Sequence, residues 1–358
     1  MTTGDMKLVT FRTDAHDRAG VLVGAVESGG EHVIDLAHGF AWIEHRAGRR
    51  CDAAHVADRY GKGVLGFVEN ADVARPAADE LVACWQSGAL PATFDGRVVL
   101  SPLADVRLRA PLPSPPSLRD GYAFRAHVEA ARRARGLPMP PEFDAFPVFY
   151  FSNHRAVVGP GDVRVEREHL GALDYELEAA IVVGRRARNV RAAEADEAIF
   201  GMTVMNDWSA RALQSQEMKL NLGPAKGKDF ATSLGPWLVT VDELLARARR
   251  TERGLVFDME MRAEVNGRLL SRGNLRDMTW TFAQILERAS LGVELAPGEV
   301  LGSGTCGTGC LLELNGSAAA GAGDGSGRRG GETWLQPGDV VALEIDGLGR
   351  LENRVTVA

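Results

Sequence analysis

Acidic residues at alternate positions are the strongest chemical signal in the chain, in the run Leu-Asp-Tyr-Glu-Leu-Glu over residues 173–178. In a β-strand these side chains share one face, which would place Glu176 and Glu178 roughly 7 Å apart. The run continues into apolar residues 179–183, which favours burial, and buried neighbouring carboxylates need a cation to offset their charge. The alternative is an exposed edge strand with solvated acids, which is commoner for a lone acidic pair. The apolar continuation favours a metal site.

A second candidate group is Asn-Asp-Trp-Ser-Ala-Arg over residues 206–211, followed by Gln214. Asp207 comes after a short apolar strand and before a predicted helical turn, so it is also a candidate N-cap. Arg211 and Gln214 are three positions apart and would share one helical face. They are therefore candidates for pointing hydrogen-bond donors into one site.

A third group contains Asp120 and His127, seven positions apart. If residues 118–135 are helical throughout, two turns separate these side chains and they lie on one face. A helix cap for Asp120 and a surface position for His127 are the alternatives, and each is the better one for either residue alone.

Several tempting motifs are excluded. Residues 302–307 match a three-glycine dinucleotide pattern, but the strand-like residues 311–314 follow where a helix is needed. Residues 223–228 are one residue short of a phosphate loop, and Asp229 stands where Ser or Thr is required. Cys306 and Cys310 have no accompanying Cys or His pair, so a zinc site is not predicted. No serine lies in a nucleophile elbow.

The elements that must position these residues are mostly strands, and the proline cluster at residues 105–117 predicts a domain boundary. We predict a small β-rich domain over residues 1–104, a Pro-rich linker over 105–117 and a catalytic domain over 118–358. Strands are predicted at 7–11, 21–26, 32–36, 97–100, 146–151, 173–183, 203–205, 237–241, 255–265, 299–301, 311–314 and 340–345. Helices are predicted at 71–85, 118–135 and 279–289. The Gly-rich residues 315–331 predict a surface loop. Since regular helices do not separate the strands, a β-rich α+β fold is expected.

Composition narrows the class of protein. The 358 residues carry a formal net charge of −7, which argues against nucleic-acid binding. No stretch approaches a membrane span or a signal peptide, so membrane association is not expected. The four cysteines, in a chain of this length without a signal, are expected to be reduced thiols in the cytoplasm.

Taken together, the motifs resemble the fumarylacetoacetate hydrolase family over the whole region from Asp120 to the end. They occur in the family's order: Asp-x-Tyr-x-x-x-x-His, Phe-Pro-Val-x-Tyr, Leu-Asp-x-Glu-x-Glu, Met-Asn-Asp-Trp-Ser-Ala-Arg, Gly-Lys-x-Phe-x-Thr and Gly-Ser-Gly-Thr. The first domain resembles the family's small amino-terminal barrel only weakly. The resemblance implies a mixed β-sandwich roll, preceded by a small β-barrel-like domain, and a homodimer.

The resemblance also implies a role for each matching residue. The ligands of a divalent cation would be Asp120, Glu176, Glu178 and Asp207. Carboxylates suit Mg²⁺ or Ca²⁺, and Mn²⁺ is a third candidate. His127 matches the general base and Glu313 the acid that orients it, while Arg211 and Lys228 match cations near a developing oxyanion. Positions that contact substrate match Tyr122, Tyr150, Arg211, Gln214 and Thr305. Lys228 and Thr232 match a second, structural Mg²⁺ site with Asp207.

These roles imply a hydrolase that acts on carbon–carbon bonds in ketonic substances. Water activated by His127 and Glu313 would cleave a β-diketo acid, such as fumarylacetoacetate or another acylpyruvate, with a metal-stabilised enolate as leaving group. The alternative on the same fold is a hydratase, isomerase or decarboxylase of a 2-keto acid, and a non-catalytic binding protein is a third reading. Gly121, Met218 and a missing arginine depart from the pattern of fumarylacetoacetase, which points to a different acylpyruvate or 1,3-diketone.

Overall fold

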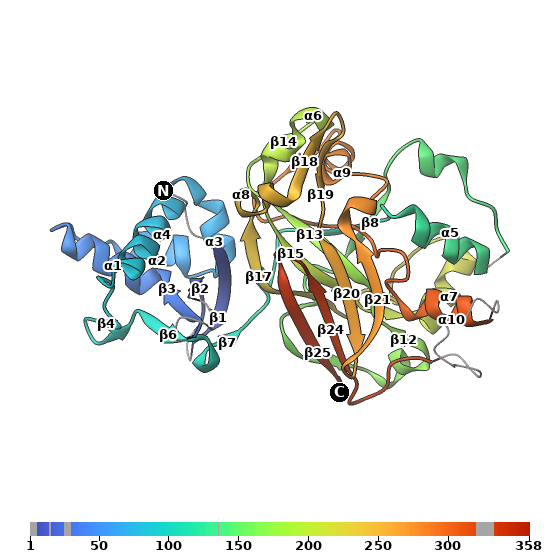
Figure 1. Cartoon of the computed structure of the whole chain (residues 1–358), viewed down its shortest axis with the longest axis horizontal. Coiled ribbons are helices and arrows are strands. Elements are labelled where there is room, and N and C mark those ends of the chain that lie inside the picture. The colour runs from blue at the N-terminus through green and yellow to red at the C-terminus, as the bar shows by residue number, and fades with distance from the viewer. Residues whose placement is uncertain (1–5, 14–15, 25–29, 135, 320–332) are drawn as a thin grey trace.

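The computed structural model of the chain describes residues 6–13, 16–24, 30–134, 136–319 and 333–358. Two β-sheets dominate it, one of 12 strands and one of five (Figure 1). The large sheet runs in the order β6-β3-β2-β1-β17-β15-β13-β23-β8-β9, with β7 paired to β1 and β10 paired to β17. The smaller sheet runs β11-β25-β24-β20-β21. This mixed, strand-rich architecture confirms the predicted fold class, although neither sheet closes into a barrel.

The described residues up to 108 supply one end of the large sheet and a group of helices beside it. The strands in that sheet are β1 (Lys7–Arg12), β2 (Asp17–Val23), β3 (His32–Asp35), β6 (Leu100–Pro102) and β7 (Arg107–Leu108), while β4 (Thr93–Phe94) and β5 (Arg97–Val98) pair separately. The helices are α1 (Leu36–Arg46), α2 (Ala53–Tyr60), α3 (Val64–Glu69) and α4 (Ala71–Gln86). The predicted helix at 71–85 is confirmed, whereas α1 to α3 were not predicted. The predicted strand at 21–26 reaches into residues 25–29, which lie outside the described part.

The rest of the large sheet comes from residues after the proline cluster. Its strands are β8 (Leu118–Gly121), β9 (Phe149–Ser152), β10 (Val157–Val158), β13 (Leu177–Val183), β15 (Ile199–Asp207), β17 (Thr232–Thr240) and β23 (Val300–Gly302). Strand β1 pairs antiparallel with β17, with Lys7 opposite Val239, so one continuous sheet crosses the predicted domain boundary. The division at residues 105–117 therefore stays a prediction.

The smaller sheet packs on one face of the large one. Its strands are β11 (Gly161–Val165), β20 (Glu260–Val265), β21 (Arg268–Asn274), β24 (Val340–Ile345) and β25 (Gly349–Val357). Ile181 of β13 and Val204 of β15 share a buried cluster with Met261 and Leu343 of the smaller sheet. The alternate residues, such as Val182 and Met205, face a second cluster that includes the amino-terminal helices. Because side chains alternate along a strand, the large sheet is buried on both faces.

Short elements complete the described chain. Three further strand pairs are β12 (Leu173–Asp174) with β16 (Ser209–Ala210), β14 (Ala187–Arg188) with β22 (Glu294–Leu295), and β18 (Ala248–Thr251) with β19 (Gly254–Phe257). The later helices are α5 (Arg125–Ala134), α6 (Ala192–Ala195), α7 (Arg211–Glu217), α8 (Val241–Leu244), α9 (Phe282–Ala289) and α10 (Leu311–Ala319). In Figure 1, α5, α7 and α10 lie together at the side of the sheets away from the amino terminus. Among the described helices, none combines the length and apolar character needed to cross a bilayer.

Two predicted elements that carry candidate site residues are wrong. The predicted helix at 118–135 is strand β8 followed by helix α5, so Asp120 and His127 do not share a helical face. The predicted strand at 311–314 is the first turn of α10. This helix runs into the predicted loop at 315–331, of which residues 320–331 lie outside the described part.

The candidate active site

Four buried carboxylates meet at one end of interior strands of the large sheet. Asp120 lies near the end of β8, Asp207 ends β15, Glu178 lies near the start of β13 and Glu176 immediately precedes that strand. Each can offer one oxygen such that all four oxygens lie within 4.8 Å of one another. All four residues are at most 5% exposed. The large sheet therefore brings together four acids from three separate stretches of the chain.

Glycine at position 302 leaves room for these acids. A Cβ atom added there would stand 2.5 Å from Oδ1 of Asp120 and 3.1 Å from Oε2 of Glu178. Gly302 ends strand β23, which pairs with β8 and β13 and so lies between the two acidic strands. The sequence pattern that mimicked a dinucleotide motif thus includes a packing requirement of the carboxylate cluster.

Two cations balance part of this charge. Nζ of Lys228 donates to Oε2 of Glu176 and to Oδ2 of Asp207, both at 2.6 Å. Nη2 of Arg211 donates to Oε1 of Glu176 at 2.7 Å, and its Nε donates to Oδ2 of Asp174 at 2.9 Å. Burial alone would lower the pKa of Lys228, but Asp207 and Glu176 outweigh it, so its ammonium stays charged.

The remaining carboxylate oxygens lack such partners. Among the described residues, nothing donates a hydrogen bond to either carboxylate oxygen of Glu178 or to Oδ1 of Asp207, and all three atoms are buried. Burial raises the pKa of Glu178 well above its ordinary value, and the neighbouring Asp120 raises it further. Burial and Asp207 raise the pKa of Asp120 to about 7. Among the described residues, Lys228 and Arg211 are the Lys and Arg side chains that form ion pairs with these five buried carboxylates, Asp174 included, and an oxygen-liganded divalent cation fits the unpaired oxygens.

A histidine–glutamate pair lies beside the carboxylates. Nδ1 of His127 on α5 is 2.5 Å from Oε1 of Glu313 on α10, and both side chains are buried. The other oxygen of Glu313 accepts the backbone N–H of Thr308 at 3.0 Å. An ionised Glu313 would accept from an Nδ1–H of His127, and in a neutral ring this arrangement would leave Nε2 available as a base. Lys228 and Arg211 hold the pKa of Glu176 below its ordinary value, against the effect of burial.

Asp174 positions this pair from a distance. It was expected to share a strand face with Glu176 and Glu178, but β12 ends at Asp174 and the chain breaks from the strand before Leu177. Its carboxylate instead accepts the first amides of α10, from Leu311 at 2.7 Å and Leu312 at 3.1 Å. A dinucleotide site was excluded because residues 311–314 were predicted to form a strand. That reason is wrong, since helix α10 follows the glycines. However, Asp174 already occupies the anion-binding amides at the start of that helix.

The other residues singled out in the sequence also line or border this region. The hydroxyl of Tyr150 donates to Oδ2 of Asp207, and the ring of Tyr122 packs edge-on against His127 with centroids 5.5 Å apart. Oε1 of Gln214 accepts from Nη1 of Arg211 at 3.0 Å. Oγ1 of Thr305 donates to the carbonyl of Leu177 at 3.2 Å, and Thr232 lies opposite Asp207 in the β15–β17 register.

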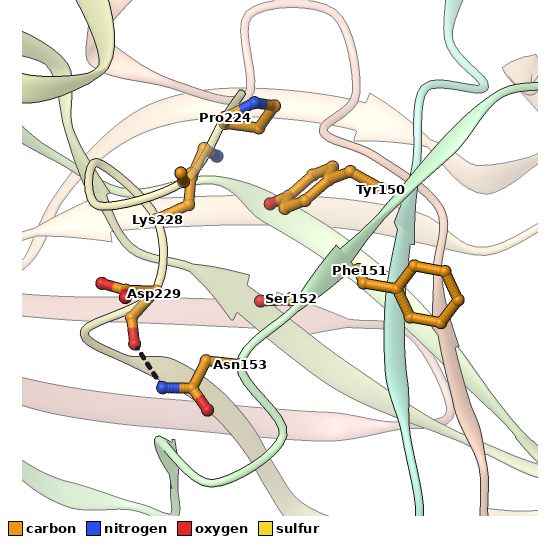
Figure 2. A pocket seen from close by; sticks show the side chains of 8 residues that line it. Tyr150, Phe151, Ser152, Asn153, Pro224, Lys228 and Asp229 are labelled. Carbon is orange, nitrogen blue, oxygen red and sulfur yellow. Dashed lines mark hydrogen bonds between the residues drawn. The ribbon is translucent and has the colours of Figure 1, made fainter. Parts of the chain in front are cut away.

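A cavity of about 250 Å³ opens next to the carboxylates. Figure 2 shows Tyr150 and Lys228 facing each other across it, while Phe151 points away. Both Tyr150 and Lys228 bond to Asp207, so the wall of the cavity borders the carboxylate cluster. Its lining is completed by Ser152, Asn153, Pro224, Ala225 and Asp229.

Sequence reasoning missed three contributions to this site. Gly302 was considered only as part of the rejected dinucleotide motif. The helix start at Leu311 could have been recognised from an acidic residue in its first turn, Glu313, although its cap, Asp174, is distant in sequence. Cys310, whose Sγ lies 3.8 Å from Oε1 of Glu313, was considered only together with Cys306, in the rejected zinc pattern.

The family model described as "Fumarylacetoacetate (FAA) hydrolase C-terminal" matches residues 117–356. The chain is 35% identical to fumarylacetoacetase of Bos taurus over 202 residues, which cover 48% of this chain and 47% of that protein. It is 29% identical to oxaloacetate tautomerase YisK of Bacillus subtilis (strain 168) over 257 residues, covering 71% of this chain and 74% of that protein. This chain thus matches about half of one relative and nearly three quarters of the other.

Among solved structures, maleylpyruvate hydrolase from Sphingobium sp. SYK-6, in complex with manganese(II) ion and pyruvate, superposes with a TM-score of 0.64. The superposition covers 99% of this chain and 100% of that chain at 20% sequence identity, which shows a common fold. The family is shown by the family model, which matches most of the chain. This chain belongs to the fumarylacetoacetate hydrolase family.

Proposed function

We propose that the chain is a divalent-metal-dependent hydrolase that cleaves a carbon–carbon bond in an acylpyruvate or another β-diketo acid. The observation that carries this proposal is the pairing of two features: four converging carboxylates with unpaired buried oxygens, and the His127–Glu313 pair beside them. The family's relatives include both hydrolases and a tautomerase, so membership alone leaves the reaction open.

The carboxylate set formed by Asp120, Glu176, Glu178 and Asp207 would hold the cation, and Mg²⁺, Mn²⁺ or Ca²⁺ suits its oxygen ligands. A bound cation of this kind supplies Lewis-acid polarisation of a substrate carbonyl. Lys228 and Arg211 keep Glu176 ionised and so keep one ligand ready at neutral pH. A second site that uses Lys228 and Thr232 with Asp207 remains part of the proposal.

Each of the surrounding side chains then has a separate role in the reaction. Nε2 of His127 takes a proton from water, while Glu313 stabilises the imidazolium through Nδ1. Arg211 and Lys228 place positive charge where an oxyanion develops, and Gln214 adds an amide donor beside Arg211. Tyr122, Tyr150 and Thr305 border the space in which substrate would bind. The buried setting strengthens each of these electrostatic interactions.

Keto–enol tautomerisation or another non-hydrolytic reaction of a 2-keto acid is the second candidate. It is favoured by the tautomerase relative, which matches more of this chain than the fumarylacetoacetase does. The two reactions make different demands on His127, because tautomerisation moves a proton on carbon and consumes no water. The His127–Glu313 contact, which is the arrangement needed for a base that activates water, favours hydrolysis.

A substrate panel tests the proposal. Purified protein would be assayed with acylpyruvates of different acyl length and with oxaloacetate, in Mg²⁺, Mn²⁺ or Ca²⁺ and after EDTA treatment. We expect EDTA-sensitive release of pyruvate from at least one acylpyruvate, measured by coupled reduction of the pyruvate. Turnover of oxaloacetate tautomers without pyruvate release from any acylpyruvate would favour the tautomerase instead. The homodimer and the cytoplasmic location stay predictions, for which sedimentation and fractionation are the measurements.

A further inference from the structure

Three unlike ligand atoms converge between helices α5 and α10. A ring nitrogen of His127, Sγ of Cys310 and a carboxylate oxygen of Glu313 lie within 4.8 Å of one another. The Nδ1–Oε1 distance is 2.5 Å and the Sγ–Oε1 distance is 3.8 Å. All three residues are at most 6% exposed. The proposed hydrolysis uses only His127 and Glu313, so the thiol has no part in it.

This set of atoms differs in chemistry from the four carboxylates. One nitrogen, one sulfur and one oxygen suit zinc and softer ions, whereas an all-carboxylate site suits hard ions. Zinc bonds of about 2.0–2.3 Å in tetrahedral geometry separate neighbouring ligands by about 3.3–3.8 Å. The Sγ–Oε1 distance already has this value. For an ion to enter, the His127–Glu313 hydrogen bond must open by about an ångström.

We propose that His127, Cys310 and Glu313 form an inhibitory site for a borderline or soft divalent cation, of which Zn²⁺ and Cd²⁺ are the examples. Its binding is independent of the proposed function, and its inhibitory effect rests on that function. As the sulfur–metal bond forms, the thiol proton leaves to solvent. Coordination at Nδ1 transfers that nitrogen's proton to Nε2 through water, so the neutral imidazole keeps one N–H. The lone pair at Nε2 is thereby lost, and with it the base that would activate water.

A binding experiment tests the site without any turnover. The full-length protein carrying Cys51→Ser, which removes the exposed thiol, is titrated with Cd²⁺ in excess Mg²⁺. Thiolate–cadmium bonds absorb in the ultraviolet, whereas carboxylate–cadmium bonds do not, so the four-carboxylate site is silent. We expect saturable absorbance, its loss on adding Cys310→Ser, and its retention on adding Cys306→Ser, a matched buried thiol outside the set. An unchanged band in the Cys310→Ser protein would overturn the proposal.

An inhibition experiment tests the consequence. Zn²⁺ is preincubated with the enzyme in excess Mg²⁺, because the buried ligands imply slow entry, and residual acylpyruvate hydrolysis is measured. Loss of a residue that hydrogen-bonds to a metal ligand already lowers metal affinity about 10- to 100-fold. Loss of the ligand itself in Cys310→Ser should therefore raise the half-inhibiting Zn²⁺ concentration by at least that factor. Equal Zn²⁺ sensitivity of this variant and the parent would place inhibition at the carboxylates and contradict the proposal.

The two experiments separate failure of the site from failure of the function. If the parent protein hydrolyses no acylpyruvate, the proposed function fails while the cadmium titration still decides the site. Thermal melts of both serine variants establish that they are folded. If Cys310→Ser is unstable, Cys310→Ala removes the same ligand, and retained cadmium absorbance in it again counts against the site.

Discussion

Glu176 and Glu178 are two positions apart in the chain, yet their surroundings push them in opposite directions. Lys228 and Arg211 both contact Glu176 and hold its pKa below the ordinary value despite burial. Burial and the neighbouring Asp120 raise the pKa of Glu178. The alternating acidic pattern was visible in the sequence. The partners that separate the two acids were not, because they come from residues 35 and 52 positions away.

Replacing Glu178 with glutamine should raise the stability of the metal-free protein and lower its activity. Because burial raises the pKa of Glu178, folding of the metal-free parent at neutral pH costs free energy to protonate this acid. Glutamine has no such cost, so the metal-free variant should melt at a higher temperature than the metal-free parent. The same change removes a proposed ligand, so Mg²⁺ or Mn²⁺ should no longer raise the melting temperature, and activity should fall about 10²-fold or more. Calorimetry with and without EDTA measures both effects. A parent-like response to metal would show that Glu178 is not a ligand.

Replacing His127 with asparagine should remove catalysis while sparing metal binding. A positioned base contributes about 10²–10⁴-fold, so kcat for acylpyruvate hydrolysis should fall by that factor. The metal-induced rise in melting temperature should persist, because His127 is not one of the four converging carboxylates. His169→Asn is the matched control, since that residue stacks on Phe230 instead. If His127→Asn retains most of the hydrolysis rate but loses metal binding, the proposed roles are reversed.

At the scale of elements, strand ends set the positions of the acids and one helix start sets the position of Glu313. Strands β13 and β15 were each predicted in part, but β8, which carries Asp120, was predicted as helix. At Gly121 this segment lies very close to its paired strand, since an added Cβ atom would stand 2.9 Å from the carbonyl oxygen of Gly302. This close approach is a tertiary constraint, and helical composition in residues 122–134 concealed it.

Replacing Gly302 with alanine should damage the site more than the fold. The added methyl would press on Met205 and on the carboxylates of Asp120 and Glu178. Overpacking of this kind costs about 1–3 kcal/mol, and the displaced acids should bind metal more weakly. Gly171→Ala is the matched control, because its Cβ would meet only Ala212 at 3.5 Å. Isothermal titration with Mn²⁺ compares the two, and equal affinities would contradict this account of Gly302.

Replacing Asp174 with asparagine should loosen the helix that carries Glu313. Asp174 accepts two amides at the start of α10 and the guanidinium of Arg211, and hydrogen bonds to charged groups contribute about 1.5–3 kcal/mol each. We therefore expect faster amide hydrogen exchange over residues 311–316 and a lower kcat, with substrate binding less affected. Exchange in the amino-terminal helix α4 serves as the internal reference. Unchanged exchange in α10 would show that Asp174 does not anchor it.

At the scale of the whole molecule, the sequence was sufficient for the fold class and for the order of the second-domain motifs. It was not sufficient for the relation between the two predicted domains. The proline cluster suggested separate units, whereas β1 continues the large sheet through β17, and Met6, Leu238 and Val182 share one buried cluster. Strands β1 and β17 are more than 200 residues apart in the chain, so no local sequence pattern indicates their antiparallel pairing. Helices α1 and α2 could have been found from their N-caps, Asp35 and Asp52, which accept amide hydrogen bonds at each helix start.

The pH dependence of stability should report the state of the carboxylate cluster. Burial and Asp207 raise the pKa of Asp120 from 3.8 to about 7, so the metal-free folded chain holds protons that the unfolded chain releases. Its stability should therefore fall as pH rises from about 4 to about 7, because the native state binds more protons in that window. A bound cation favours ionised carboxylates and removes this loss. The metal-induced rise in melting temperature should consequently be larger at pH 8 than at pH 5.5, measured with Mn²⁺ against EDTA. The Glu178→Gln protein should show no metal-induced rise in melting temperature at either pH. If the rise in the parent is equal at both pH values, protons and metal do not compete for these four acids.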